Sequence, residues 1–159
     1  MKHIIIALMT AVVVTCGAGL ALAHDSVELP PPGLTPSNFF YFLDRLGETL
    51  QEVFTFGAEA KVKLQLNFAA ERVAELELEL ETKGVEAKGL EVARARLAEH
   101  IGRANKIISD EDSKGKDIKK LSEDFDGDLK ELLLVAEEGS DGLVAEMEEV
   151  EKMLLLEDR

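Results

Sequence analysis

Hydrophobic residues recur along most of the chain at intervals of three and four positions. The first such stripe follows a proline-rich segment and consists of Phe39, Leu43, Leu46, Leu50 and Val53. This spacing places the apolar side chains on one face of an α-helix. Thr35 or Ser37 can cap the start of that helix, and Pro36 is tolerated in a first turn. We therefore expect a helix over residues 38–55.

Four more stripes of the same period follow, separated by short polar or glycine-containing breaks at Gly57 and at residues 82–84, 109–116 and 137–142. They predict helices over residues 58–82, 86–108, 116–137 and 141–156. The alternating run "ELELELE" at 75–81 would favour a strand by itself. Its flanks keep the helical period, and Glu, Leu and Ala are good helix formers, so a helix is expected there too.

Long amphipathic helices joined by short turns lie antiparallel to their neighbours. The sequence thus predicts an all-α fold, with about five helices arranged as antiparallel hairpins or a bundle in one domain over residues 37–159. Because the stripes are close to heptads, we expect coiled-coil-like packing within the chain or between two chains.

The first 23 residues have the features of a secretory signal peptide. Lys2 precedes an apolar run, and small residues ending in "ALA" provide a cleavage site. The alternative is an uncleaved anchor helix, since residues 4–23 approach the length that spans a bilayer. The single cysteine, Cys16, lies in this segment. A lipid-bearing Cys16 is disfavoured because Thr15 precedes it. Residues 24–36 form a proline-rich lead, which favours extended geometry.

The formal net charge of −14 narrows the range of partners. A strongly acidic surface repels nucleic acid and anionic lipid, so we expect no nucleic-acid binding and membrane contact only through an uncleaved signal segment. Cations and basic proteins remain compatible with this charge. The partners we expect are a second copy of the chain or an envelope protein.

Several metal and cofactor sites were considered and disfavoured. His24 would be the first residue after cleavage and could form a copper site with His100, but no strand pattern accompanies it. A di-iron bundle needs Glu-x-x-His motifs, and Leu97 stands where His100 would require a glutamate. Residues 110–121 match a calcium loop at Asp110, Asp112 and Gly115 but have Leu121 in place of the bidentate glutamate. We predict no metal site and no cofactor, with weak calcium or copper binding left open.

Catalytic residues are not expected either. A nucleophile needs a base within hydrogen-bond reach, and the chain after residue 23 has no cysteine and two histidines, His24 and His100. No phosphate-binding loop or Gly-x-Ser-x-Gly motif occurs. We therefore predict that the protein is not an enzyme.

Residues 29–82 contain two motifs in neighbouring helices. A proline-containing lead is followed by aromatic-Leu-x-Arg-Leu-x-Glu, and the next helix contains Ala-x-x-Arg-x-x-Glu. The motif residues are Tyr41, Leu43, Arg45, Leu46, Glu48, Ala69, Arg72 and Glu75. With these motifs, residues 29–82 resemble a family of secreted helical domains, the domain of unknown function numbered 5667. The resemblance implies a family without an assigned activity.

The motif side chains are expected to be structural. In an antiparallel hairpin that turns near Gly57, the motif helices would lie side by side. We expect Tyr41, Arg45 and Glu48 to pair with Glu71, Arg72 and Glu75 beside the apolar seam. We also expect one group of aromatic side chains to fill that seam, namely Phe39, Phe40, Phe42, Phe54, Phe56 and Phe68.

Taken together, these features predict an exported, non-enzymatic helical module with a structural or protein-interaction role in the cell envelope. The alternative is an envelope stress protein with chaperone or metal-handling activity.

Overall fold

The computed structural model describes residues 29–36 and 38–157, and this part of the chain is all-α, as predicted. Its helices are α2 (Tyr41–Phe54), α3 (Ala58–Lys83), α4 (Lys88–Ser113), α5 (Lys119–Glu138) and α6 (Asp141–Glu157). The predicted signal peptide and the first five residues of the lead, 24–28, lie outside the described residues. None of the described helices is long and apolar enough to cross a membrane.

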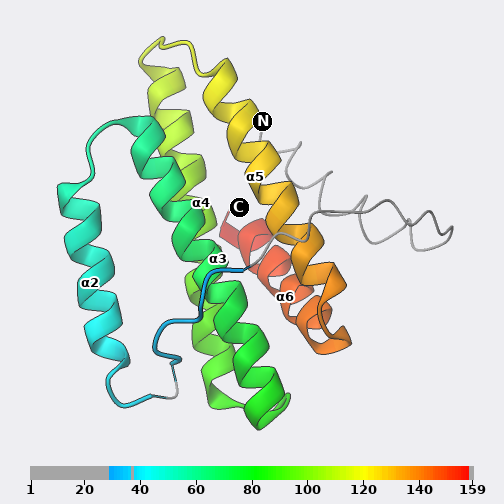
Figure 1. Cartoon of the computed structure of the whole chain (residues 1–159). Helices are drawn as coiled ribbons and strands as arrows, with labels where there is room; N and C mark the ends of the chain where they lie inside the picture. Colours follow the sequence, from blue (N-terminus) through cyan, green and yellow to red (C-terminus); the bar gives the residue numbers. More distant parts are fainter. Residues whose placement is uncertain (1–28, 37, 158–159) are drawn as a thin grey trace, which may run out of the picture.

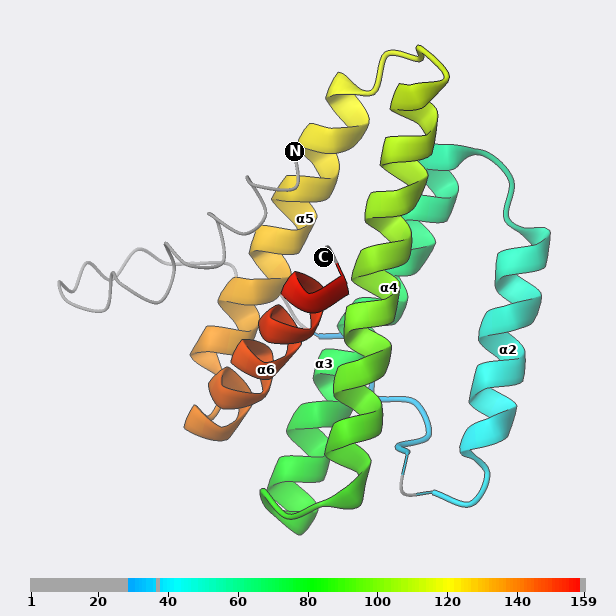
Figure 2. The same cartoon turned by 180° about the vertical axis from the view of Figure 1, so that it is seen from behind.

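The long helices α3 and α4 form an antiparallel pair at the centre of the fold (Figure 1). Helices α5 and α6 pack on one side of this pair, and α2 stands on the other side, which the reverse view also shows (Figure 2). Gly57, at φ 89°, ends the turn between α2 and α3, and Gly84, at φ 74°, ends α3. Other residues rarely adopt such backbone angles, so glycine fits both turns.

The predicted stripes of the last four helices meet in one core. Buried members include Val73 and Leu76 of α3, Leu97 and Ile101 of α4, and Phe125 of α5, all at most 1 % exposed. Burial of such side chains is the main favourable contribution to folding. The fold is thus a four-helix core to which α2 is added.

Three details differ from expectation. Helix α2 begins at Tyr41 instead of residue 38, with Phe40 at its N-cap, so Thr35 and Pro36 lie before its first turn. Helix α4 continues to Ser113, so residues 109–113 are helical although their polar composition predicted a loop. The run at 75–81 is helical, as expected, but places Glu75 and Glu79 at 0 % exposure. Glu79 forms an ion pair with Lys83 one turn later, with N and O atoms 2.9 Å apart. Glu75 belongs to a larger cluster.

Candidate functional site

Arg72 of α3 is completely buried, at 0 % exposure, and lies at the centre of a group of polar side chains. Its Nη1 donates a hydrogen bond to the hydroxyl oxygen of Tyr41 at 2.9 Å. Its Nη2 lies close to four carboxylate oxygens, those of Glu75 (2.9 Å), Glu48 (3.0 Å), Asp44 (3.2 Å) and Glu71 (3.3 Å). We call these six residues the Arg72 cluster.

The cluster joins α2 to α3. Tyr41, Asp44 and Glu48 are spaced three and four positions apart, so they lie on one face of α2 and point at Arg72. Glu71 and Glu75 flank Arg72 on α3 itself. A guanidinium group carries five N–H donors in a planar fork, which suits it to several carboxylates at once.

The carboxyl groups of Asp44, Glu48, Glu71 and Glu75 share one cation, the Arg72 guanidinium, in a largely buried environment. Burial raises the pKa of the Glu75 carboxyl to about 8, the Arg72 guanidinium opposes this shift, and the neighbouring carboxylates reinforce it. Burial also raises the pKa of Glu48 and of Glu71. Near neutral pH the Glu75 side chain therefore holds a proton most of the time.

His100 of α4 adjoins the cluster and is 1 % exposed. Its Nδ1 lies 2.8 Å from Oε1 of Gln65, and its Nε2 lies 3.8 Å from Oε2 of Glu48. Gln65 donates from its Nε2 to Glu52, which orients its carbonyl oxygen towards His100 and assigns the imidazole proton to Nδ1. Burial, aided by the positive charges of Arg72 and Arg103, lowers the pKa of His100 to about 4. The ring is therefore neutral at pH 7.

Carboxylate oxygens of Asp44, Glu48 and Glu71 lie within 4.8 Å of one another, a spacing that could hold a metal ion. The Arg72 guanidinium, however, is 3.0–3.3 Å from an oxygen of each of them. A metal ion bound by the same three carboxylates would have to displace this internal cation. The donor set therefore fits the guanidinium better than a metal. His24, the other half of the copper site considered, lies outside the described residues.

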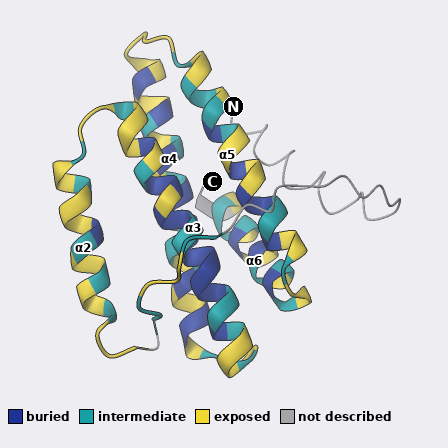
Figure 3. Ribbon diagram, viewed as in Figure 1, coloured by how far each residue is buried: buried dark blue, intermediate teal, exposed yellow. Residues whose placement is uncertain are grey.

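The second notable surface is the outward face of α2. Leu43, Leu46, Leu50 and Val53 of the predicted stripe lie on it, and Phe39 lies in the turn just before the helix. All five are exposed by 49–85 %. Four further phenylalanines, Phe40, Phe42, Phe54 and Phe56, are 53–80 % exposed around them. Figure 3 shows α2 as largely exposed along its length. We call the five stripe residues the α2 stripe.

The expectation that these aromatics fill a seam between α2 and α3 is therefore wrong. Among the six phenylalanines named for that role, Phe68 alone is buried, at 1 % exposure. The reason is the Arg72 cluster. A buried guanidinium must be matched by carboxylates, and α2 supplies them from its polar face. Turning that face inwards turns the α2 stripe outwards.

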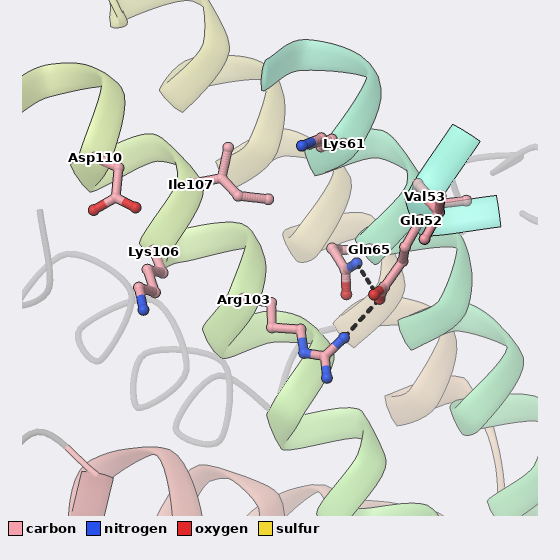
Figure 4. A pocket seen from close by; sticks show the side chains of 9 residues that line it. Glu52, Val53, Lys61, Gln65, Arg103, Lys106, Ile107 and Asp110 are labelled. Atoms are coloured by element: carbon pink, nitrogen blue, oxygen red, sulfur yellow. Dashed lines mark hydrogen bonds and ion pairs between the residues drawn. The ribbon is translucent and has the colours of Figure 1, made fainter. Parts of the chain in front are cut away.

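An open pocket of about 420 Å³ lies where the end of α2 meets α3 and α4 (Figure 4). Val53, Leu64 and Ile107 form its apolar part, and charged side chains including Lys61 and Lys106 surround it. At its base, Oε1 of Glu52 accepts hydrogen bonds from Gln65 (2.9 Å) and Arg103 (2.6 Å). This second polar contact also fastens the inner face of α2 to α3 and α4.

The motif residues predicted from the sequence fall into three places. Tyr41, Glu48, Arg72 and Glu75 meet in the Arg72 cluster, Ala69 is buried in the core at 0 % exposure, and Arg45 is exposed. None of the ion pairs among the described residues involves Arg45. It acts on the cluster only at longer range, by opposing the rise in the pKa of Glu48.

Three participants were not predicted as members of these contacts: Asp44, Gln65 and His100. Asp44 could have been found, because it follows Tyr41 by three positions on the face opposite the α2 stripe. Gln65 precedes Arg72 by seven positions and so lies on the same face of α3, a spacing that could have marked it. His100 carries no comparable signal.

The model of one protein family, Domain of unknown function (DUF5667), matches residues 33–154. The chain belongs to this family. The match spans the described helices almost completely, so the Arg72 cluster and the α2 stripe both lie inside the DUF5667 domain. Neither the curated proteins nor the solved structures contain a match to the chain.

Proposed function

We propose that this DUF5667 domain is an exported, non-enzymatic interaction module of the cell envelope, and that it binds through the α2 stripe. The observation that carries this proposal is the outward position of the stripe, with its five large apolar side chains 49–85 % exposed. The signal-peptide pattern of residues 1–23 supports export.

The size of the exposed surface supports a binding role. The largest apolar patch of an ordinary monomer is roughly 300–600 Å². Nine apolar side chains gather on and around α2, five of them phenylalanines at 53–85 % exposure. An aromatic side chain has an area of roughly 150–250 Å², so the patch is on the order of 1,000 Å². A surface of this size is typical of a protein–protein contact.

The way α2 is attached also suits binding. The ion pairs of Arg72 and the hydrogen bonds of Glu52 fix the helix by its inner face, so the α2 stripe is already ordered before a partner arrives. Preorganisation lowers the entropic cost of binding. The buried His100, by contrast, is enclosed between Gln65 and Glu48 and is not placed to meet a substrate.

Site-specific photo-crosslinking in the native cells tests the proposal. A photoreactive residue in place of Leu46, at the middle of the α2 stripe, should give a discrete protein adduct in the envelope fraction. The control is the same residue in place of Val92, which is 42 % exposed on α4, outside the patch. Equal adducts at the two positions, or none at Leu46, would overturn the proposal.

A chaperone is the second candidate, because an exposed apolar stripe on an acidic domain can also hold unfolded chains. The purified protein would then suppress aggregation of a heat-denatured client, and Leu46→Glu would abolish that activity while Val92→Glu would not. For metal handling, the three carboxylates near Arg72 are the supporting observation. A titration with Mn²⁺ or Ca²⁺ that gave a stoichiometric site would favour it over the interaction role.

A further inference from the structure

We propose that the α2 stripe binds a second copy of this chain, with the two α2 helices packed antiparallel about a twofold axis at Leu46. This inference rests on the proposed function and names its partner. The protein is then a symmetric dimer in which the exposed α2 stripe of each copy is covered by the α2 stripe of the other.

The spacing of the stripe points to a helix as the partner. Phe39, Leu43, Leu46, Leu50 and Val53 alternate steps of four and three residues, which is the seam of a two-stranded coiled coil. In the other helices this pattern is used within the chain, since their stripes are buried in the common core. In α2 and the turn before it, which holds Phe39, the same pattern has no counterpart among the described residues, and every member is at least 49 % exposed.

Self-pairing of the stripe gives a consistent register. In a twofold contact, residue i of one copy meets residue j of the other and j meets i. An antiparallel pair centred on Leu46 sets Phe39 against Val53, Leu43 against Leu50, and Leu46 against itself. All five members of the stripe are then covered at once.

The ends of the stripe are complementary in shape. Phe39 is bulky and 85 % exposed, and it stacks edge-to-face with Phe40 at a ring distance of 5.2 Å. Val53 at the other end is smaller and lines the open pocket of about 420 Å³, together with Leu64 and Ile107. Antiparallel pairing brings the aromatic end of each copy to the pocket of the other. Parallel pairing would instead oppose the bulky ends and leave both pockets open.

The distribution of charge removes the main objection to self-association. Two chains of net charge −14 repel each other at long range. The acidic residues of α2, however, point inwards, where Asp44 and Glu48 contact Arg72 and Glu52 contacts Gln65 and Arg103. Arg45 is the exposed charge on α2. The contact therefore buries no opposed carboxylates, and added salt, which screens the remaining repulsion, should strengthen the dimer.

The area is sufficient. A stable protein–protein interface buries about 800 Å² on each partner. The apolar side chains on and around α2 offer on the order of 1,000 Å² per copy, by the area of an aromatic side chain.

Sedimentation velocity of the purified full chain tests the oligomeric state. We expect a dimer that tightens with salt, a monomer with unchanged helical circular dichroism for Leu46→Glu, and a dimer for the matched control Val92→Glu. Leu50→Arg provides a second disruptive change should Leu46→Glu lose its helical signal. A wild-type chain that is monomeric up to its solubility limit would overturn the inference, as would a dimer that survives both stripe variants.

Disulfide trapping tests the register. In a Cys16→Ser background, Leu46→Cys should crosslink to itself under mild oxidation, and Val92→Cys should not. A mixture of Phe39→Cys and Val53→Cys chains should form the mixed disulfide in preference to either symmetric one. Preferential Phe39→Cys homodimers would show parallel pairing and refute the proposed geometry.

The outcome separates this inference from the proposed function. If the chain is monomeric but the photoreactive residue at Leu46 still traps another envelope protein, the interaction module stands and self-pairing is wrong. If the chain is monomeric and the position at Leu46 traps nothing, both are wrong.

Discussion

Glu75→Gln removes the buried carboxyl group whose ionisation opposes folding. Glu75 is 0 % exposed, and its pKa is about 8 in the folded protein, against an ordinary value of 4.5. Between these two values the folded state holds a proton that the unfolded state has lost. The free energy of unfolding therefore falls as the pH rises through this range. Glutamine keeps the shape and a hydrogen-bond donor but does not titrate.

The size of the effect follows from the shift. Each pH unit between the two pKa values changes the free energy of unfolding by about 1.4 kcal/mol. From pH 6 to pH 8, the wild type should thus lose about 2 kcal/mol through Glu75, because the group is only half ionised at pH 8. His100, with a folded pKa of about 4 and an unfolded value of 6.5, acts in the opposite direction below pH 6.5. It is present in both proteins, so their difference isolates the contribution of Glu75.

Urea denaturation followed by circular dichroism at pH 6, 7, 8 and 9 provides the measurement. The two proteins should be similar in stability at pH 6, and Glu75→Gln should be more stable than wild type at pH 9, by about 2–3 kcal/mol. The matched control is Glu77→Gln, a partly exposed neighbour on α3. Parallel pH profiles for wild type and Glu75→Gln would refute the assignment of the buried proton.

Three further predictions concern the same framework. Arg72→Met should lower the free energy of unfolding by about 3–5 kcal/mol, because it leaves buried carboxylates without their cation. In urea denaturation the loss should be smaller at pH 6 than at pH 8, and a loss below about 1 kcal/mol would contradict the prediction. Phe125→Ala should cost about 3–5 kcal/mol, whereas Leu50→Ala on the exposed face of α2 should cost much less, about 1 kcal/mol or below. Equal losses in urea denaturation would mean that the stripe face of α2 packs inwards. Gly57→Ala should lower the melting temperature, because Gly57 has a φ of 89°. Gly127→Ala should raise it, because Gly127 lies in the middle of α5 with free space around a Cβ, and the gain in stability should be about 0.5–1 kcal/mol. The reverse order would contradict the turn geometry.

The fold was largely predictable because apolar periodicity and glycine breaks are local signals. The stripes of α3 to α6 define both the helices and the faces that meet in the core. The end of α4 was less predictable, because residues 109–113 are polar enough for a loop. They remain helical up to Ser113, and Glu111 in this last turn forms ion pairs with Lys114 and Lys116.

The orientation of α2 could not be predicted from its stripe. Periodicity shows that a helix has an apolar face, but it does not show which face a neighbour prefers. Here the neighbouring helix places a buried cation, Arg72, on the side facing α2, and the acidic face of α2 satisfies it. The expected pairing of the two motif helices is found at Tyr41 and Arg72, whose side chains share a hydrogen bond. The rotation of α2 about its own axis followed from charge.

Attachment by ion pairs gives α2 a thermodynamic signature of its own. Undocking of a helix normally exposes apolar surface, which makes it sensitive to denaturant and raises the heat capacity. Release of α2 from Arg72 and Gln65 would expose mostly polar groups, so it should show a shallow denaturant slope and little change in heat capacity. Hydrogen exchange of the backbone amides of α2 should therefore depend on pH and ionic strength through the undocking of the helix. The amides of α3 should exchange only when the core unfolds. We therefore expect two cooperative units with different sensitivities to denaturant, pH and salt within one small domain.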